Sequence, residues 1–187
     1  MQDKASVFPA PLFVVDHAPY REWIQPVLRR LPPFSGEPVR IEMKAGLRDR
    51  QRAAHAGSFL RDRRIAFNCN RREFRRIFVH EVFHFVWVRL GNPPRWSYEE
   101  LLRRELAAGA SGELGWSAEW RKHALVSADW RNRSRRWREY CCESFCDSAA
   151  WLYSGIEAHA EFTLGRRFRN FRQEWFAGIA KAGPLSI

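Results

Sequence analysis

The chain has 187 residues, 45% of them hydrophobic and 14% aromatic, which is enough to bury the core of a single domain. No window approaches the run of about 20 apolar residues that crosses a membrane, and no stretch is of low complexity, so the composition argues against a membrane protein and a disordered chain. The net charge of +11 admits an anionic partner but does not require one, because arginine is abundant along the whole chain.

The first half of the chain predicts a small sheet with one helix. Alternating apolar residues indicate strands, apolar residues at helical spacing indicate the helix, and proline pairs and glycine mark the turns. In chain order the predicted elements are a strand or ordered arm at 11–15, a helix over Tyr20–Leu31, a strand at 39–43, a polar loop at 45–54, and a hairpin with arms 54–60 and 64–68.

The strongest helix prediction follows the hairpin directly. Asn70 is a good N-cap, and Glu73 three residues later completes a variant of the capping box. A long apolar run follows, Gly91 suits a left-handed position after the helix, and Pro93-Pro94 cannot continue it. Because the helix is apolar nearly all round, the pattern indicates a buried helix.

The second half of the chain predicts mostly helices. In chain order they are a helix from Ser97 as N-cap to about Leu106, a loop over 107–115, a short helix over Trp116–His123, a long helix from about Ser134 to Tyr153, and a basic amphipathic helix over Phe162–Ile179. The last helix is expected to pack through four aromatic residues, Phe168, Phe171, Trp175 and Phe176.

The capped helix carries His80, Glu81 and His84 in an H-E-x-x-H pattern. Residues four apart lie on one face of a helix, so both imidazoles can bind one zinc ion, and the carboxylate between them can serve as base for a metal-bound water. Three polar groups inside a buried helix need partners, because an unpaired buried polar group costs free energy. Zinc is the partner that satisfies all three.

A catalytic zinc ion needs a third protein ligand and leaves its fourth position to water. Glu143 and Asp147 are four apart on the long second-half helix, among small and apolar residues. A ligand at Glu143, with Asp147 accepting the N–H of a zinc-binding imidazole, explains two acids on a buried face. Glu139 and His123 stay open as rival ligands.

With these two motifs the chain resembles the gluzincin metallopeptidases, the H-E-x-x-H plus E-x-x-x-D class that includes thermolysin. The resemblance implies that His80, His84 and Glu143 bind zinc, that Glu81 is the general base and that Asp147 orients His80. Firm similarity covers about twenty residues in two blocks. The chain is much shorter than a two-domain enzyme of this class, and the 59 residues from His84 to Glu143 (143 − 84) are a longer interval than in thermolysin.

The resemblance also implies a sheet-edge strand that lies antiparallel to a bound peptide, followed by a second strand and then the active-site helix. Ala56, Gly57 and Ser58 match that edge strand and are the predicted substrate-binding backbone, although an internal hairpin strand is the alternative. The oxyanion of the reaction needs a further donor, for which His159, Tyr140 and Tyr153 are candidates and His159 is preferred.

We therefore expect an α+β, small zincin-like fold, with a short mixed sheet packed on a buried active-site helix and a mostly helical C-terminal half. The whole chain, 1–187, is predicted to be one metallopeptidase-like domain, divided into a sheet-containing subdomain at 1–91 and a helical subdomain at 92–187. The expected function is zinc-dependent hydrolysis of a peptide or protein substrate, with the oligomeric state left open.

Three further expectations concern location, cysteines and charge. The N-terminus has no secretion signal, and clustered cysteines do not form a disulfide framework, so a cytoplasmic protein is expected. Cys141, Cys142 and Cys146 are interpreted as small fillers of a buried helix face, with a cysteine-rich zinc site as the rival. Arginine clusters at 131–138 and 166–172 leave nucleic-acid binding as a less favoured partner. The alternative functions are a zinc-containing DNA-binding or regulatory protein and a structural zinc protein without turnover.

Overall fold

The structure, a computed structural model, describes residues 11–49 and 52–187. Its strands form one mixed sheet in the order β1-β3-β7-β6 and two further two-stranded pairs, β2 with β8 and β4 with β5. In chain order the strands are β1 (Phe13–Val15), β2 (Phe34–Ser35), β3 (Val39–Met43), β4 (Arg48–Asp49), β5 (Arg52–Ala53), β6 (Ala56–Phe59), β7 (Arg64–Phe67) and β8 (Leu185–Ser186). In the main sheet β1, β3 and β7 are parallel, and β6 runs antiparallel to β7 at the edge.

Seven helices are found in the part of the chain that the structure describes. They are α1 (Ala18–Leu28), α2 (Arg71–Arg89), α3 (Asn92–Ala107), α4 (Trp116–His123), α5 (Ser127–Arg131), α6 (Arg135–Tyr153) and α7 (Arg166–Lys181). The predicted α+β class is therefore confirmed, and the helices dominate the second half as expected. Of the helices described, none has the length and hydropathy needed to cross a lipid bilayer.

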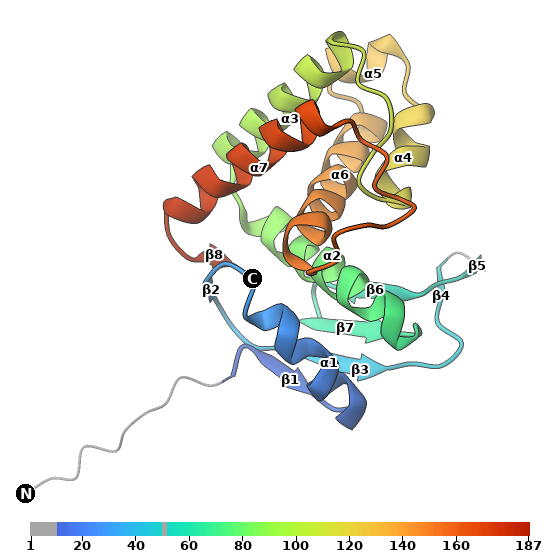
Figure 1. Ribbon diagram of the computed structural model, residues 1–187, viewed down its shortest axis with the longest axis vertical. Coiled ribbons are helices and arrows are strands. Elements are labelled where there is room, and N and C mark those ends of the chain that lie inside the picture. Colours follow the sequence, from blue (N-terminus) through green and yellow to red (C-terminus); the bar gives the residue numbers. More distant parts are fainter. Residues whose placement is uncertain (1–10, 50–51) are drawn as a thin grey trace, which may run out of the picture.

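Helix α2 lies between the sheet and the helices of the second half (Figure 1). One side of α2 packs on β6 and on α1, and the other packs along α6, its most extensive partner. Its N-cap is the one the sequence predicts, because the Asn70 side chain accepts a hydrogen bond from the Glu73 amide at 3.2 Å. After the helix, Gly91 has a positive φ of +77°, which favours glycine, but its ψ of 173° lies outside the left-handed helical conformation expected of it.

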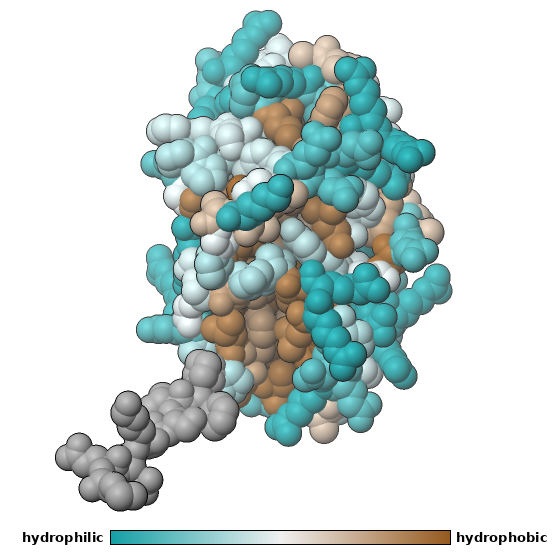
Figure 2. Space-filling view, turned by 60° about the vertical axis from the view of Figure 1, so that its left-hand side comes forward, coloured by the Kyte–Doolittle hydropathy of each residue, from teal (hydrophilic) through white to brown (hydrophobic). Residues whose placement is uncertain are grey.

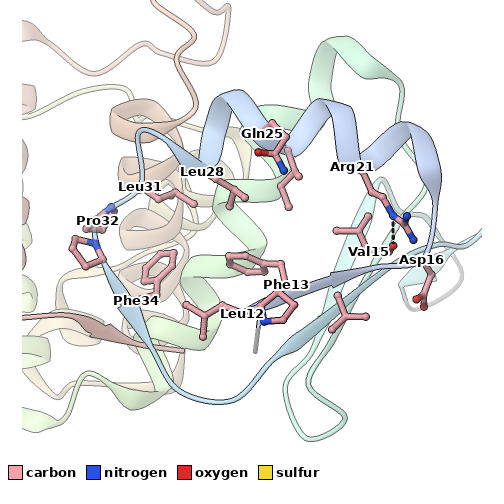
Figure 3. Close-up of a pocket in the computed structure, with 14 residues that line it drawn as sticks. Leu12, Phe13, Val15, Asp16, Arg21, Gln25, Leu28, Leu31, Pro32 and Phe34 are labelled. Atoms are coloured by element: carbon pink, nitrogen blue, oxygen red, sulfur yellow. Dashed lines mark hydrogen bonds between the residues drawn. The ribbon is translucent and has the colours of Figure 1, made fainter. Parts of the chain in front are cut away.

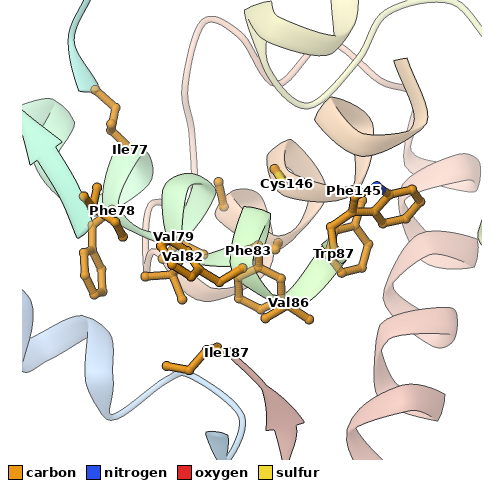
Figure 4. Packing of buried hydrophobic residues seen from close by; sticks show 14 of the residues in the cluster. Ile77, Phe78, Val79, Val82, Phe83, Val86, Trp87, Phe145, Cys146 and Ile187 are labelled. Atoms are coloured by element: carbon orange, nitrogen blue, oxygen red, sulfur yellow. The ribbon is translucent and has the colours of Figure 1, made fainter. Parts of the chain in front are cut away.

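A single large hydrophobic core joins the sheet to the helical half. Its buried residues come from α1, β3, β7, α2, α3, α4, α6, α7 and the C-terminal end of the chain. Figure 4 shows the part of this core around α2. Aromatic rings make many of the contacts between elements: Phe83 of α2 meets Phe145 of α6 with ring centroids 5.7 Å apart, and Phe145 stacks on Phe176 of α7 at 5.0 Å. Because aromatic side chains bury the most area per residue, these contacts fix how α6 sits on α2.

The C-terminal strand closes the fold beside the main sheet. Leu185 pairs in parallel with Phe34, and the side chain of Ile187 is 1% exposed within the core (Figure 4). Gly36, at φ +125°, lies against this strand, and a Cβ there would stand 2.3 Å from the carbonyl oxygen of Ile187. A glycine is therefore required at this position for both its conformation and its size.

Several predicted boundaries were wrong. The first helix ends at Leu28 rather than Leu31, and residues 45–54 contain β4 and β5 instead of being only a loop. Ser97 is not an N-cap, because Gly91 caps α3 and the prolines stand in its first turn, where a missing N–H costs nothing. The last helix begins at Arg166 rather than Phe162, and helix α5 and strand β8 were not predicted.

The packing face predicted for the last helix was also wrong in part. Phe176 is buried as expected, but Phe171 is 42% exposed. The other buried residue of this helix is Arg172, which is fully enclosed and forms ion pairs with Glu105 and Glu113 at 2.6 and 2.7 Å. Hydrophobic periodicity does not predict a buried arginine, because its burial depends on carboxylates from distant elements.

One cavity lies away from the H-E-x-x-H motif. It measures about 780 Å³ and is bounded by α1, β1 and the segment leading into β2 (Figure 3). Its wall is mostly apolar, and its charged residues are Asp16 and Arg21, which donates a hydrogen bond to the Val15 carbonyl. In Figure 2 hydrophobic residues gather at the level of the sheet and α1, flanked by hydrophilic ones. The residues that line this cavity include no set of metal ligands.

Candidate metal centre

Three donor groups from two helices converge beside a smaller cavity. The Nε2 atom of His80 lies 3.1 Å from the Nε2 atom of His84, one turn further along α2. The same His80 atom lies 3.3 Å from Oε2 of Glu143, which α6 carries. Ligand atoms of all three residues lie within 4.8 Å of one another. The structure thus brings together the three predicted ligands, which are 63 positions apart at their extremes (143 − 80).

Asp147 holds His80 from the opposite side of its ring. Its Oδ1 atom lies 2.7 Å from His80 Nδ1, and its Oδ2 atom accepts a hydrogen bond from the Ala118 amide at 2.9 Å. A carboxylate only accepts hydrogen bonds, so His80 carries a proton on Nδ1. The lone pair of Nε2 in neutral His80 then points toward His84 and Glu143, which is the orientation a metal ligand needs.

The backbone next to Asp147 is a glycine for a steric reason. Gly115 has an extended backbone that any residue could adopt, with φ −179°. A Cβ at this position would, however, stand 2.2 Å from the carboxylate carbon of Asp147. Gly115 precedes α4, so the start of that helix closes over the Asp147 carboxylate. The sequence shows Gly115 only as a loop residue, and no local signal could have revealed this role.

The electrostatics of the cluster favour a cation at its centre. Burial would lower the pKa of His80, but the carboxylates of Asp147 and Glu143 raise it well above its usual value. Burial would raise the pKa of Glu143, yet hydrogen bonding to His80 and the charges of His84 and Arg121 lower it to about 2. Without a metal, the cluster therefore attracts a second proton onto His80.

The donor set and its spacing fit zinc. Two nitrogen ligands of a tetrahedral zinc ion, each about 2.0–2.1 Å from the metal, lie roughly 3.3–3.4 Å apart. The 3.1 and 3.3 Å separations from His80 Nε2 are close to that spacing. Two imidazoles and one carboxylate are also a ligand set known for catalytic zinc, since they leave a fourth position open. The residues present therefore fit the ion that the motif predicts.

Glu81 follows His80 on α2 and is held by the edge strand. The hydroxyl of Ser58 lies 2.6 Å from Oε2 of Glu81 and 2.8 Å from its backbone oxygen, and can donate to either. Both residues line a cavity of about 410 Å³ together with His80, His84 and Glu143. Glu81 is therefore buried against the sheet yet reaches the same space as the three donor groups.

The edge strand β6 forms another wall of this cavity. Ala56, Gly57 and Ser58 all line it, and among the strands of residues 11–49 and 52–187 β6 pairs with β7 alone. The predicted hairpin is therefore confirmed, since β6 and β7 pair in antiparallel fashion. Sequence reasoning left open whether β6 is an edge strand or an internal strand, and in the structure it lies at the edge of the main sheet. The side-chain hydrogen bonds of Ser58 to Glu81 were not predicted, because they depend on how the hairpin packs on α2.

Arg121 also belongs to the cavity, and sequence reasoning missed it. Its Nη2 atom lies 3.2 Å from Oε1 of Glu143, so the two oxygens of that carboxylate face different partners. The guanidinium packs over the Trp120 ring with its carbon 4.2 Å from the centroid. The Nε atom is buried and has no hydrogen-bond partner among the residues described. No pattern in the sequence distinguishes Arg121 from the many other arginines of the chain.

The remaining candidates lie outside the cavity wall. Glu139 pairs with Arg135 at 2.7 Å, and His123 is exposed at the end of α4. His159 lies 3.5 Å from Glu73, and its Nδ1 accepts a hydrogen bond from the Glu161 amide. The two tyrosine candidates are also engaged elsewhere: Tyr140 donates to Glu113 at 2.6 Å, and Tyr153 stacks on Phe83. None of these five residues is among those that line the 410 Å³ cavity.

Many arginines of the two basic clusters are occupied within the protein. Arg133 is bound to Glu99 at 2.8 Å and Arg135 to Glu139. In the second cluster Arg172 is buried, and Arg169 donates to backbone carbonyls of the preceding loop. Since these guanidiniums are held by protein acceptors, they support a nucleic-acid interface less than the sequence suggested.

Comparisons of the chain with protein-family models, with curated proteins and with solved structures found no match. The resemblance to gluzincins therefore stays a prediction, supported by the side-chain geometry alone.

Proposed function

We propose that this protein is a zinc-dependent peptidase of the gluzincin type. The observation that carries the proposal is the position of His80 Nε2, 3.1 Å from His84 Nε2 and 3.3 Å from the Glu143 carboxylate, with Asp147 on the other ring nitrogen. Two imidazoles, one carboxylate and a carboxylate that orients an imidazole are the parts that such an active site needs.

Each residue of the cluster then has a defined task. His80, His84 and Glu143 hold the metal, and Arg121 keeps one oxygen of Glu143 occupied so that the other faces the imidazoles. When bound, zinc supplies Lewis acidity toward a substrate carbonyl and lowers the pKa of water. Glu81 accepts the proton of the attacking water and returns it to the leaving amine, while Ser58 holds its carboxylate in place.

The cavity also has a place for an extended peptide. In this proposal the free edge of β6 pairs with the substrate backbone along Ala56, Gly57 and Ser58, which border the cavity. Arg121 faces the same space, and its cationic side chain can donate to the oxygen that becomes negatively charged. We prefer it to His159 for that task because His159 is held by Glu73 and Glu161 away from the cavity.

The first experiment measures metal content and hydrolysis together. We expect about one zinc ion per chain in protein purified without chelator, and cleavage of a mixed peptide library that a chelator abolishes and added zinc restores. The substitution Glu81→Gln keeps the size of the side chain and removes its basicity, so it is expected to lower kcat by at least about 100-fold and to leave the zinc content unchanged.

Glu100→Gln is the matched control, because Glu100 is exposed on α3 and forms its ion pairs with Arg103 and Arg104 of that helix. It is expected to behave as the wild type in both measurements. Chelator-resistant cleavage, or full activity of Glu81→Gln, would rule out the proposed mechanism. Bound zinc without any cleavage would instead favour a structural zinc protein.

A further inference from the structure

A second cluster of metal-binding groups lies on the other side of His84. The Nδ1 atom of His84 lies 3.5 Å from Sγ of Cys142, and ligand atoms of His84, Cys142 and Cys146 all lie within 4.8 Å of one another. Cys142 and Cys146 are four residues apart on α6, so they share one helix face, and their sulfur atoms lie within 4.8 Å of one another. Both are free cysteines.

The two clusters use different nitrogens of one imidazole. His84 presents Nε2 to His80 and Nδ1 to Cys142. The donor types differ as well, because the first set has nitrogen and oxygen and the second has nitrogen and two sulfur atoms. Thiolates prefer soft and borderline cations, whereas carboxylates prefer harder ones.

We propose that His84, Cys142 and Cys146 form a second metal site, which binds thiophilic divalent cations such as zinc or cadmium. A tetrahedral zinc ion about 2.0 Å from a nitrogen and about 2.3 Å from a sulfur holds those two ligands roughly 3.5 Å apart. The measured separation of His84 Nδ1 and Cys142 Sγ is 3.5 Å. Two thiolates also neutralise a divalent cation, which removes the penalty of burying its charge beside Cys146, whose side chain is fully buried.

Binding at this site has two chemical consequences. Each thiol gives up its proton as its sulfur becomes a ligand, so binding releases two protons and is favoured at higher pH. Because His84 belongs to both donor sets, a cation held through Nδ1 perturbs binding through Nε2. The second site does not depend on the peptidase proposal, since its donor atoms are in place whether or not any peptide is cleaved.

The test uses cobalt(II) as a spectroscopic substitute for zinc in reduced, metal-free protein. Thiolate ligation produces an intense sulfur-to-cobalt charge-transfer band that nitrogen and oxygen ligands do not produce. We expect the band in the wild type and in His80→Ala/Glu143→Ala, which removes the first donor set but keeps the second. We expect its loss in Cys142→Ser/Cys146→Ser.

Serine separates ligation from hydrogen bonding. A serine at position 142 still accepts a hydrogen bond from His84, but it is a poor ligand for a thiophilic cation. The matched control is Cys141→Ser, because Cys141 is as buried as Cys146 and faces the charges of Glu99 and Arg103 instead. Absence of the band in the wild type, or its persistence in the double serine variant, would overturn the proposal.

A second measurement needs no substitution and covers the case in which the serine variant does not fold. Cys142 and Cys69 are both partly buried, and only Cys142 belongs to the cluster. With cadmium present, we expect alkylation of Cys142, mapped by mass spectrometry, to slow at least about tenfold, because a ligated thiolate is masked, while Cys69 reacts as before. Equal rates at Cys142 with and without cadmium would refute the site, whatever the peptidase assay shows.

Discussion

Each ligand of the candidate centre is held by a group on another element. Asp147 of α6 binds His80 of α2, Arg121 of α4 binds Glu143 of α6, and Cys142 of α6 contacts His84 of α2. Such partners fix ring orientation and protonation, and their loss typically lowers metal affinity about 10–100-fold. The ligand identities therefore account for only part of the site, and the rest lies in the groups that hold them.

The raised pKa of His80 predicts how metal-free protein responds to pH. Its pKa in the folded state lies well above its usual value, because the contacts with Asp147 and Glu143 outweigh burial. A group whose pKa rises on folding stabilises the protein fully below its unfolded pKa, about 6.5, and this contribution is lost as pH rises through the folded pKa. We therefore expect the urea midpoint of chelator-treated protein to fall as pH rises above about 6.5.

Two variants test whether His80 causes this dependence. His80→Asn is expected to flatten the pH profile of the urea midpoint, while His123→Asn, at an exposed position, keeps the slope of the wild type. An unchanged slope in His80→Asn would assign the effect to other groups. His84 is expected to add little to this dependence. Folding raises the pKa of His84 to about 9, which adds a bound proton, and lowers the pKa of Cys142 to about 6, which removes one, so the two changes offset each other.

At the scale of elements, the donor residues of the site lie on α2 and α6, which pack against each other. The start of α4 covers the Asp147 carboxylate beside them. The rings of Phe83 and Trp87 pack on Phe145 at 5.7 and 5.1 Å, which sets the position of α6 along α2. The turn before α4 then brings Gly115 against Asp147 and the Ala118 amide onto the same carboxylate. Three helices must therefore pack correctly before His80 is oriented.

Gly115→Ala tests the close contact between that turn and Asp147. The added methyl group has no room unless the carboxylate moves, so we expect zinc affinity to fall about 10–100-fold in competition with a chromogenic chelator. Gly178→Ala is the control, because a Cβ at Gly178 meets nothing within 4 Å and a helical alanine is favourable by about 0.5–1 kcal/mol. If Gly115→Ala bound zinc as tightly as the wild type, the close approach of Gly115 to Asp147 would not be needed to orient His80.

At the scale of the whole molecule, a buried ion cluster ties the C-terminal helix to the rest. Arg172 of α7 forms ion pairs with Glu105 of α3 and with Glu113 of the following loop, and its guanidinium also donates to Ser148 of α6. All four side chains are buried. Since Ser148 adjoins Asp147 on α6, the same cluster supports the helix that carries the site.

Arg172→Leu is expected to lower the free energy of unfolding by about 3–5 kcal/mol, because two buried carboxylates lose their counter-charge. The measurement is urea unfolding of the metal-loaded protein, followed by circular dichroism. Arg167→Leu, at an exposed position of the same helix, serves as the control and is expected to change stability by less than about 0.5 kcal/mol. Similar losses in both variants would mean that the buried pairs do not stabilise the fold.

The sequence by itself determined what depends on neighbours along the chain. The cap at Asn70 and the four-residue spacings of His80 with His84 and of Glu143 with Asp147 follow from helix geometry, and the structure confirms these helices. The end of α2 before Gly91 was also predicted, and Gly91 has the positive φ that favours glycine. The hairpin before α2 was also predicted, because its two arms and turn have strong local preferences.

Only the tertiary structure decided which side chains meet. Glu139, Glu143 and Asp147 share one face of α6, so helix periodicity cannot say which of them reaches the histidines. The packing of Phe145 against α2 fixes that position and puts Glu143, rather than Glu139, 3.3 Å from His80. Arg121 joins the site through the same packing, which depends on residues far apart in the sequence and therefore leaves no local pattern.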